Sequence, residues 1–264
     1  METAGHVWLI GGTSESAQLA VALSARQVPY VVSVTTEAAR KLYPKTAQLW
    51  VGKLTPQTLP SFITQWNIRC ILDASHPFAT EISVQAMSVA EVRSLAYLRY
   101  ERAAIADENS VTPADVPAIV SAASIEALLT SDILWRQRVL FTVGYRHLAK
   151  FAPLRSESQL FARVLPSVNA ISGAVAAGFT ASEIMAMRPP VSAELEAALC
   201  RHWRITRIVA KASGLPSGDA TKRKVAALLV ITLVLLQRPQ LTYPQQTNSM
   251  AKAVEFCLKT LMVY

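Results

Sequence analysis

The stretch that decides the fold is His6-Val-Trp-Leu-Ile-Gly-Gly-Thr-Ser-Glu-Ser16, close to the start of the chain. Its first half is a continuous apolar run, which is typical of a parallel β-strand that is buried on both faces. Two glycines follow at once, and Thr13 is a favoured N-cap residue for the helix that we expect over Ser14–Ala25. A strand, a glycine turn and a helix in this order predict the beginning of a doubly wound α/β sheet.

The same alternation of short apolar runs and helical segments continues outward from this stretch. In the first half we expect further strands at Tyr30–Val34, Leu49–Val51, Arg69–Leu72 and Leu95–Leu98. A polar break follows from Glu101 to Pro117, and the second half offers strands at Val139–Val143, Gln159–Arg163, Thr206–Ala210 and Leu229–Leu235, then a last helix near Thr247–Leu261. We therefore predict two Rossmann-like, doubly wound α/β lobes with parallel sheets, residues 1–105 and residues 106–264, and an interlobe cleft.

The composition agrees with two buried cores and points to an anionic partner. Of 264 residues, 52% are hydrophobic and 17% are charged, which excludes a disordered or collagen-like chain. The net charge of +8 suits nucleic acid, an acidic membrane surface, or a small molecule with several carboxylates or phosphates.

Other sequence features indicate a cytoplasmic protein without a metal site. Three widely spaced cysteines, Cys70, Cys200 and Cys257, show no zinc or redox spacing, so we expect reduced and mostly buried thiols. The N-terminus lacks the pattern of a signal peptide. The longest apolar stretch, Val225–Leu236, would span only about 18 Å as a helix, too short for a bilayer core of about 30 Å.

The glycine turn at residues 11–14 is a candidate phosphate-binding loop. Gly11 and Gly12 allow a ligand to approach the backbone, while Thr13 and Ser14 add hydroxyl groups at a helix N-terminus, which favours anions. Ser16 stands where a dinucleotide fingerprint has its third glycine. An ordinary tight turn is therefore the alternative interpretation.

The end of the second expected strand bears on the choice of cofactor. An acidic residue usually follows this strand in NAD-binding folds, where it holds the ribose hydroxyls. Here Ser33 and Thr35 occupy this region, and Arg40 and Lys41 follow. Hydroxyls and cations suit the 2′-phosphate of NADP, whereas Glu37 argues against it, and a solvated loop is the alternative.

Two further segments carry groups suited to catalysis or anion binding at strand ends. In Asp73-Ala-Ser-His-Pro-Phe78, His76 could donate to a cofactor or protonate a substrate near neutral pH, or it could brace its loop. In Arg99-Tyr-Glu-Arg102, the two arginines could hold carboxylates or could pair with Glu101.

A cationic loop follows a strand in the second half. Lys211-Ala-Ser-Gly214 suits an anionic ligand, and a surface loop is the alternative. The run Lys222-Arg223-Lys224 that comes after it is typical of a solvated helix face.

Taken in order, these segments resemble the precorrin-6A reductase family of cobalamin (corrin ring) biosynthesis, including its cobalt-precorrin-6A branch. The resemblance covers nearly the whole chain. It rests on Gly11 to Glu15, Asp73-Ala-Ser-His-Pro-Phe78, Arg99-Tyr-Glu-Arg102, Thr142-Val-Gly144, Arg163-Val-Leu-Pro166, and Lys211-Ala-Ser-Gly214 followed by Lys224. The segment around His76 is the most specific of these.

The resemblance implies an oxidoreductase that uses NADPH to reduce one macrocycle double bond of precorrin-6A or cobalt-precorrin-6A, a tetrapyrrole with many carboxylates. Together with the turn and strand-end arguments above, it predicts cofactor contacts at Gly11, Gly12, Thr13, Ser14, Ser33, Thr35, Ser75, His76, Pro77 and Phe78. It predicts substrate contacts at Arg99, Arg102, Gly144, Lys211, Ser213, Gly214 and Lys224. His76 is the candidate proton donor, and the protein mainly supplies orientation and electrostatics.

The chain also departs from the family pattern, and other functions compete with this interpretation. Ala103 replaces a frequent proline, Met187-Arg188-Pro189-Pro190 replaces a Gly-Pro-Phe stretch, and Lys211 to Gly218 replaces a more glycine-rich segment. An NADP-dependent reductase of a smaller anionic or carbonyl substrate is the alternative enzyme. A nucleic-acid binder is disfavoured because the cations are scattered, so we expect neither nucleic acid nor membrane as partner. Neighbouring corrin-pathway enzymes are the candidate protein partners.

Overall fold

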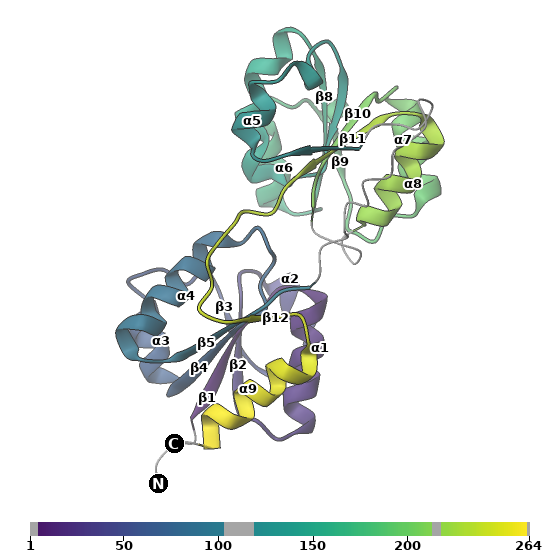
Figure 1. The fold of residues 1–264 in the computed structure, drawn as a ribbon. Coiled ribbons are helices and arrows are strands. Elements are labelled where there is room, and N and C mark those ends of the chain that lie inside the picture. Colours follow the sequence, from purple (N-terminus) through teal and green to yellow (C-terminus); the bar gives the residue numbers. More distant parts are fainter. Residues whose placement is uncertain (1–4, 103–118, 213–217, 263–264) are drawn as a thin grey trace. The chain divides into compact units, whose positions relative to one another are not determined.

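The computed structural model describes residues 5–102, 119–212 and 218–262 (Figure 1). The chain divides into two compact units, one formed by Met1–Ala103 with Pro239–Tyr264 and the other by Ala104–Arg238. Each unit has a six-stranded sheet, and every strand pair in both sheets is parallel. The predicted fold of two doubly wound α/β lobes is confirmed.

The sheet of the first unit has the strand order β12-β5-β4-β1-β2-β3. Its strands are β1 (His6–Ile10), β2 (Tyr30–Val34), β3 (Gln48–Val51), β4 (Ile68–Asp73), β5 (Ala96–Tyr100) and β12 (Gln246–Thr247). The chain progresses from β1 toward β3 on one side and from β4 toward β5 on the other. The order therefore reverses between β1 and β4, and in open α/β sheets such a reversal is where ligands bind.

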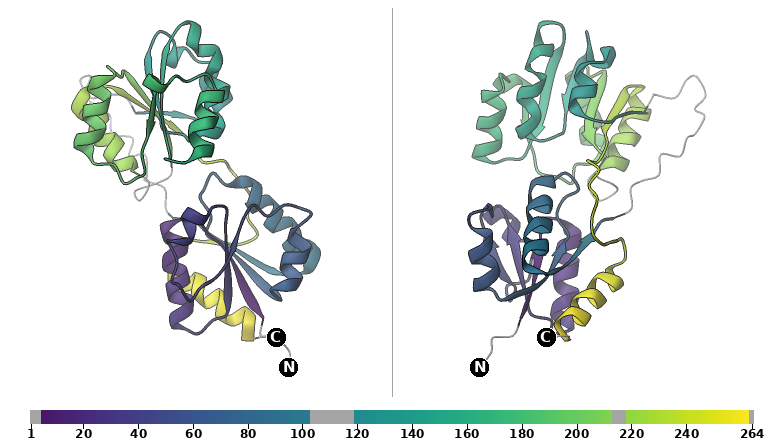
Figure 2. Two further views of the ribbon diagram at one scale, coloured as in Figure 1. Left: turned by 180° about the vertical axis from the view of Figure 1, so that it is seen from behind. Right: turned by 60° about the vertical axis from the view of Figure 1, so that its left-hand side comes forward.

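Helices cover both faces of this sheet (Figure 2). They are α1 (Ser14–Ala25), α2 (Glu37–Arg40), α3 (Leu59–Gln65), α4 (Thr80–Arg93) and α9 (Met250–Met262). Successive residues of a strand face opposite sides, so Leu9 packs in the core beneath α1 and α9, and Trp8 packs in the core beneath α3 and α4. This double burial explains why β1 is an unbroken apolar run.

The second unit repeats this arrangement with the strand order β6-β11-β10-β7-β8-β9. Its strands are β6 (Ile119–Ala122), β7 (Arg138–Phe141), β8 (Gln159–Val164), β9 (Ile184–Ala186), β10 (Arg207–Lys211) and β11 (Thr232–Leu236). Its helices are α5 (Ile125–Leu129), α6 (Val168–Ala176), α7 (Ala193–His202) and α8 (Asp219–Leu229), with 3-10 turns η1 (Asp132–Leu134), η2 (Tyr145–Ser156) and η3 (Ala181–Glu183). Here the strand order reverses between β7 and β10.

The chain passes from the first unit to the second before β6 and returns to the first unit before β12. β6 follows β5 in the chain, but it pairs with β11 of the second sheet. Conversely, β12 follows β11, but it pairs with β5 of the first sheet, with Gln246 opposite Arg99 and Thr247 opposite Tyr100. The edge strand β6 of the second sheet therefore comes directly after β5 of the first sheet in the sequence, and the edge strand β12 of the first sheet comes directly after β11 of the second.

The return of the chain to the first unit after Arg238 corrects the predicted extent of the second lobe. Residues 239–264 belong to the first unit, because β12 extends its sheet and α9 buries Ala253, Val254 and Cys257 in its core. The predicted boundary at residues 105/106 lies outside the described residues. The sequence prediction also lacked β6, β9 and β12, which are too short to show an apolar period.

Several smaller expectations can be compared with the structure. The strand predicted from Leu229 begins at Thr232, because α8 extends to Leu229 and ends at Val230, a residue with a φ of 54°. All three cysteines are free and buried, as predicted. Within the described ranges, every helix falls short of the length and apolar character that a bilayer span requires.

Candidate functional site

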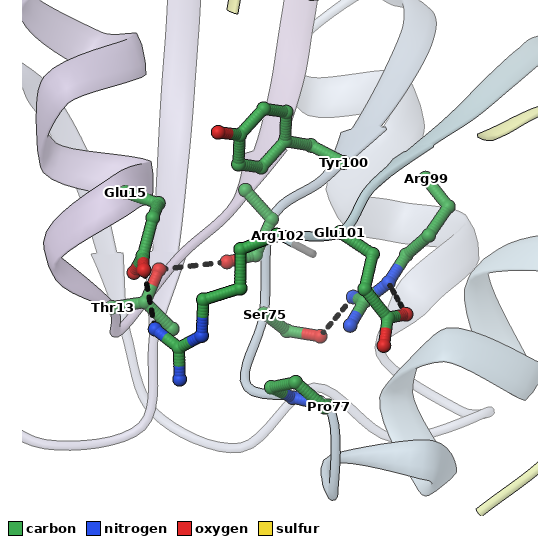
Figure 3. A pocket seen from close by; sticks show the side chains of 9 residues that line it. Thr13, Glu15, Ser75, Pro77, Arg99, Tyr100, Glu101 and Arg102 are labelled. Carbon is green, nitrogen blue, oxygen red and sulfur yellow. Dashed lines mark hydrogen bonds and ion pairs between the residues drawn. The ribbon is translucent and has the colours of Figure 1, made fainter. Parts of the chain in front are cut away.

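The candidate site lies where the strand order of the first sheet reverses. The glycine turn after β1 and the polar segment after β4 meet there, and the end of β5 closes the same edge (Figure 3). Together they form a small pocket, which is lined by Thr13, Glu15, Ala74, Ser75, Pro77, Arg99, Tyr100, Glu101 and Arg102. The strand order thus brings predicted site residues that follow β1, β4 and β5 to one place.

The glycine turn is held in shape by a capping box. The Thr13 hydroxyl accepts a hydrogen bond from the Ser16 amide, and the Ser16 hydroxyl accepts one from the Thr13 amide, both at 3.0 Å. Thr13 also donates to the Ala74 carbonyl at 2.9 Å, which ties this turn to the segment after β4. Ser14 is exposed at the first position of α1.

Tyr43 is a member of this turn that the sequence did not reveal. Its hydroxyl accepts a hydrogen bond from the Gly12 amide at 2.7 Å and lies 2.6 Å from the Ser16 hydroxyl. A Cβ atom at Gly11 would lie 2.3 Å from the Tyr43 oxygen, so glycine is required there for close approach. Gly12 has a φ of 103°, and open space surrounds the place of its missing side chain. No local signal links these residues, because Tyr43 lies far along the chain.

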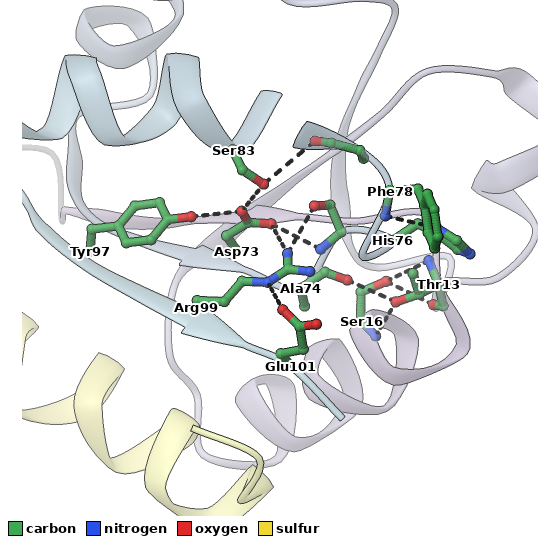
Figure 4. Close-up of polar contacts among 12 residues, drawn as sticks. Thr13, Ser16, Asp73, Ala74, His76, Phe78, Ser83, Tyr97, Arg99 and Glu101 are labelled. Carbon is green, nitrogen blue, oxygen red and sulfur yellow. Dashed lines mark hydrogen bonds and ion pairs between the residues drawn. The ribbon is translucent and has the colours of Figure 1, made fainter. Parts of the chain in front are cut away.

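Asp73 is the centre of a buried polar network (Figure 4). The carboxylate is fully buried, with 0% of the residue exposed. It accepts hydrogen bonds from four groups: the Ser75 amide at 3.0 Å, the Ser83 hydroxyl at 2.6 Å, the Tyr97 hydroxyl at 2.7 Å and Arg99 Nη1 at 2.8 Å. Burial, followed by the charge of Asp73, raises the pKa of Tyr97 far above its ordinary value, so this phenol stays a donor.

Arg99 forms the floor of the pocket. It is 1% exposed, and besides Asp73 it donates to the Ser75 hydroxyl at 3.0 Å and to the Glu101 carboxylate at 3.2 Å. Burial acts to lower the pKa of Arg99, but the charge of Asp73 raises it, and the balance lies above the ordinary value. This geometry supports the alternative that Arg99 pairs with Glu101, since its donors are turned to neighbouring side chains. Arg102 pairs instead with Glu15 of α1.

The segment from Ser75 to Phe78 is only partly turned toward the pocket. Ser75 and Pro77 are buried and line it. His76 Nδ1 accepts a hydrogen bond from the Phe78 amide at 3.2 Å, and the two rings lie 5.9 Å apart. His76 therefore braces its own loop, and this bond places the proton of the neutral ring on Nε2.

The residues at the end of β2 separate into a buried and an exposed group. Ser33 is 6% exposed, and its hydroxyl accepts a hydrogen bond from the Trp8 indole at 2.8 Å. The side chain of Ser33 thus lies in the core, on the face of β2 that it shares with the buried Val31, whereas its contact with a cofactor stays a prediction. Thr35 is exposed, and Arg40 forms a 2.9 Å ion pair with Glu37.

The predicted substrate residues of the second unit lie at its own strand reversal. Gly144 follows β7 with a φ of 83°, and Lys211 ends the adjacent strand β10. Burial, followed by the charge of Arg146, lowers the pKa of Lys211 to about 8. Ser213 and Gly214 lie outside the described residues. Lys224 is exposed on α8, where its charge acts on Glu194 of α7, so it is not part of this group.

The basic run of α8 differs from its expected exposure. Lys222 is 5% exposed, and its ammonium group donates to the Gly218 carbonyl at 3.3 Å. Nearby, Arg163 and Glu196 form a nearly buried ion pair, and the charges of both residues act on the ammonium group of Lys222. Tertiary packing of α7 on α8 buries this side of the run, so Lys222 is buried, Arg223 is half-buried and Lys224 is exposed.

Comparison with known proteins agrees with this architecture. The family model described as "Precorrin-6x reductase CbiJ/CobK" matches residues 6–258. A cobalt-precorrin-6A reductase of Synechocystis sp. is 39% identical over 99% of both chains. A precorrin-6A reductase of Mycobacterium tuberculosis is 31% identical over 89% of this chain and 90% of its own.

A solved structure shows the same fold at low sequence identity. The structure titled "CobK precorrin-6A reductase" has a TM-score of 0.75 at 19% identity and covers 97% of each chain. Both lobes are therefore shared. The chain belongs to the precorrin-6x reductase family.

Proposed function

We propose that this protein reduces one double bond in the macrocycle of precorrin-6A or of its cobalt form, with NADPH as the hydride donor. The observation that carries this proposal is the pocket at the strand reversal between β1 and β4, where the glycine turn and the Ser75–Phe78 segment meet. The printed names of the relatives supply the class of substrate.

The residues at the turn fit a dinucleotide. Gly12 faces open space, which lets a pyrophosphate approach the backbone, and the N-terminus of α1 favours its negative charge. Ser14 is exposed there, and its hydroxyl, which donates to the Glu15 carboxylate at 3.0 Å, would turn to the phosphate. Thr35, Arg40 and Lys41 are all exposed beyond β2, and they would receive the 2′-phosphate that distinguishes NADPH from NADH.

The reaction needs orientation by the protein and a proton for the carbon next to the one that receives the hydride. The nicotinamide supplies the hydride when it is bound. Arg99 holds the oxygen of Ser75 through Nη1, so the hydroxyl hydrogen of Ser75 is directed away from Arg99. The proton for the neighbouring carbon would come from solvent or from the substrate's own nitrogens, because the Phe78 amide donates to Nδ1 of His76 and so keeps this ring neutral, and a neutral imidazole is too weak an acid to protonate carbon.

The second unit would hold the acidic arms of the substrate. Lys211, Arg146 and His147 lie close enough for their charges to interact, since Lys211 and Arg146 both lower the pKa of His147, after the effect of burial. A cluster of this sign attracts carboxylates. Gly144 beside it would let a large macrocycle approach the backbone.

The test is a titration of the purified protein with NADPH and NADH, followed by anaerobic addition of precorrin-6A with and without cobalt. We expect tighter binding of NADPH than of NADH and a change in the absorbance of one macrocycle. Binding of NADPH without turnover of either macrocycle would favour a reductase of another anionic substrate. No dinucleotide binding would disprove the reductase proposal.

A further inference from the structure

The ion pair between Glu15 and Arg102 crosses the pocket. Glu15 lies in the first turn of α1, and Arg102 follows the end of β5 (Figure 3). The side chains are only 13% and 14% exposed, in contrast to surface pairs of the same unit such as Glu255–Lys259. A partly buried ion pair at this place has two neighbours of functional interest, the capped turn and the Ser75 segment.

Glu15 places a negative charge where an N-terminal anion would be stabilised. Burial acts to raise the pKa of Glu15, but hydrogen bonds from Arg102 and from its own backbone amide lower it below the ordinary value on balance. The carboxylate is therefore ionised at neutral pH, and it engages one of the amides at the start of the helix. It acts as an internal anion at the N-terminus of α1.

The pocket is narrow while this pair is formed. Its volume is about 10 Å³, roughly the space that one water molecule needs, so a phosphate group does not fit. Arg99 cannot move aside to enlarge the pocket, because it is buried and donates hydrogen bonds to Asp73, Ser75 and Glu101. Glu15 and Arg102 are long lining side chains that are partly exposed, so they have more room to change rotamer than the buried Arg99.

We propose that the Glu15 carboxylate occupies the place of the cofactor's pyrophosphate in the free protein, and that Arg102 exchanges Glu15 for a phosphate oxygen when the dinucleotide binds. In the free protein, Arg102 neutralises Glu15. In the complex, Arg102 pairs with a phosphate oxygen, and Glu15 turns away from the anion that replaces it. This assignment moves Arg102 from the predicted substrate contacts to the cofactor contacts, because it lies beside Thr13 and Glu15 at the phosphate turn.

The inference rests on the proposed function, and dinucleotide binding by the unaltered protein tests that function separately. The experiment measures the dissociation constant of NADPH for the unaltered protein, Glu15→Gln, Arg102→Gln and the double variant. Glu255→Gln removes the same charge from the exposed pair on α9 and is the matched control. Thermal unfolding of each variant checks that it is folded.

Partner exchange predicts opposite effects of the two single substitutions. Glu15→Gln removes the competing anion, so NADPH should bind about threefold to tenfold more tightly. Arg102→Gln should weaken binding about tenfold. The loss caused by Arg102→Gln should be larger in the Glu15→Gln background, because Arg102 is then not engaged by Glu15 beforehand. Glu255→Gln should leave the dissociation constant unchanged.

A merely structural ion pair predicts a different pattern. Glu15→Gln and Arg102→Gln would then weaken binding alike, and the double variant would bind no worse than either one. That result, or an unchanged dissociation constant in Glu15→Gln, would overturn the inference while leaving the proposed function intact. If the unaltered protein binds no NADPH, the proposed function itself fails.

Discussion

At the scale of single residues, Asp73 has the most demanding environment in the first unit. It is a fully buried carboxylate whose charge is balanced by Arg99, itself 1% exposed. Asp73→Asn removes the fully buried counter-charge of Arg99 and leaves the Glu101 carboxylate, whose side chain is 23% exposed, to balance the buried guanidinium, and breaking a buried pair in this way costs far more than the pair contributes relative to an apolar substitute. Asp73→Asn should therefore lower the free energy of unfolding by about 3–5 kcal/mol, measured by urea denaturation.

Glu81→Gln is the matched control for this prediction. Glu81 forms an ion pair with Lys53 at 2.7 Å, but both side chains are mostly exposed. Exposed pairs contribute about 0–1 kcal/mol, so this variant should unfold almost like the unaltered protein. A loss below about 1 kcal/mol in Asp73→Asn would show that Glu101 alone is a sufficient counter-charge for Arg99.

Lys211 provides a prediction about pH at the same scale. Burial, then Arg146, lowers its pKa to about 8. Only the protonated form attracts a carboxylate, so binding of the polycarboxylate tetrapyrrole should be strongest below pH 8 and decline as the pH rises above it. Lys211→Arg keeps its charge throughout this range and should remove the decline. Binding curves with the same pH dependence in both proteins would exclude contact between Lys211 and a substrate carboxylate.

The free energy of unfolding should also depend on the protonation of Lys211, with the opposite sign from a lysine whose pKa is raised by an anionic partner. The unfolded lysine holds its proton up to the ordinary lysine pKa of 10.5, whereas the folded one loses it near 8. Between these values the unfolded state binds more protons, so the stability of the second unit gains from rising pH in this window.

At the scale of elements, the turn between β1 and α1 connects backbone geometry with ligand binding. Gly12 combines a φ of 103° with open space at the place of its side chain. Gly12→Asp and Gly12→Asn impose the same backbone strain and nearly the same volume, but only Asp adds a negative charge. If the pyrophosphate lies at this turn, Gly12→Asp should bind NADPH about tenfold more weakly than Gly12→Asn. Equal dissociation constants, measured by fluorescence titration, would remove Gly12 from the cofactor site.

At the scale of the whole molecule, the C-terminal segment from Pro239 is part of the first unit only, so the first unit depends on this segment and the second unit does not. A chain that ends at Arg238 keeps every described element of the second unit. It loses β12 and α9, and with them Ala253, Val254 and Cys257 from the core of the first unit. The first unit should therefore unfold at a lower urea concentration, while the second unit should keep its stability.

Tryptophan fluorescence can follow the two units separately. The first unit contains Trp8, Trp50 and Trp66, and the second contains Trp135 and Trp203, so a variant that retains only the tryptophans of one unit reports on that unit. An unchanged unfolding midpoint for the first unit in the shortened chain would show that β12 and α9 add nothing to its stability.

The sequence by itself determined the class of fold, the family and the burial of the cysteines. These features depend on local patterns: the apolar run before Gly11, the helix cap at Thr13 and the order of strand-end motifs such as the one around His76. Such patterns lie within a few residues of one another, and the strand and helix periods make them readable. They also placed Thr13, Ser75 and Arg102 at the ends of the strands that form the pocket.

Only the tertiary structure decided which side chains meet. It showed that Ser33 binds Trp8 in the core, that Tyr43 engages Gly12, that Lys222 is buried, and that Arg102 faces Glu15. It also assigned α9 and β12 to the first unit. Each of these is a pairing between groups distant in sequence, or depends on which face of an element another element covers. Composition and local periodicity do not predict such contacts, because many chain topologies bury the same apolar residues.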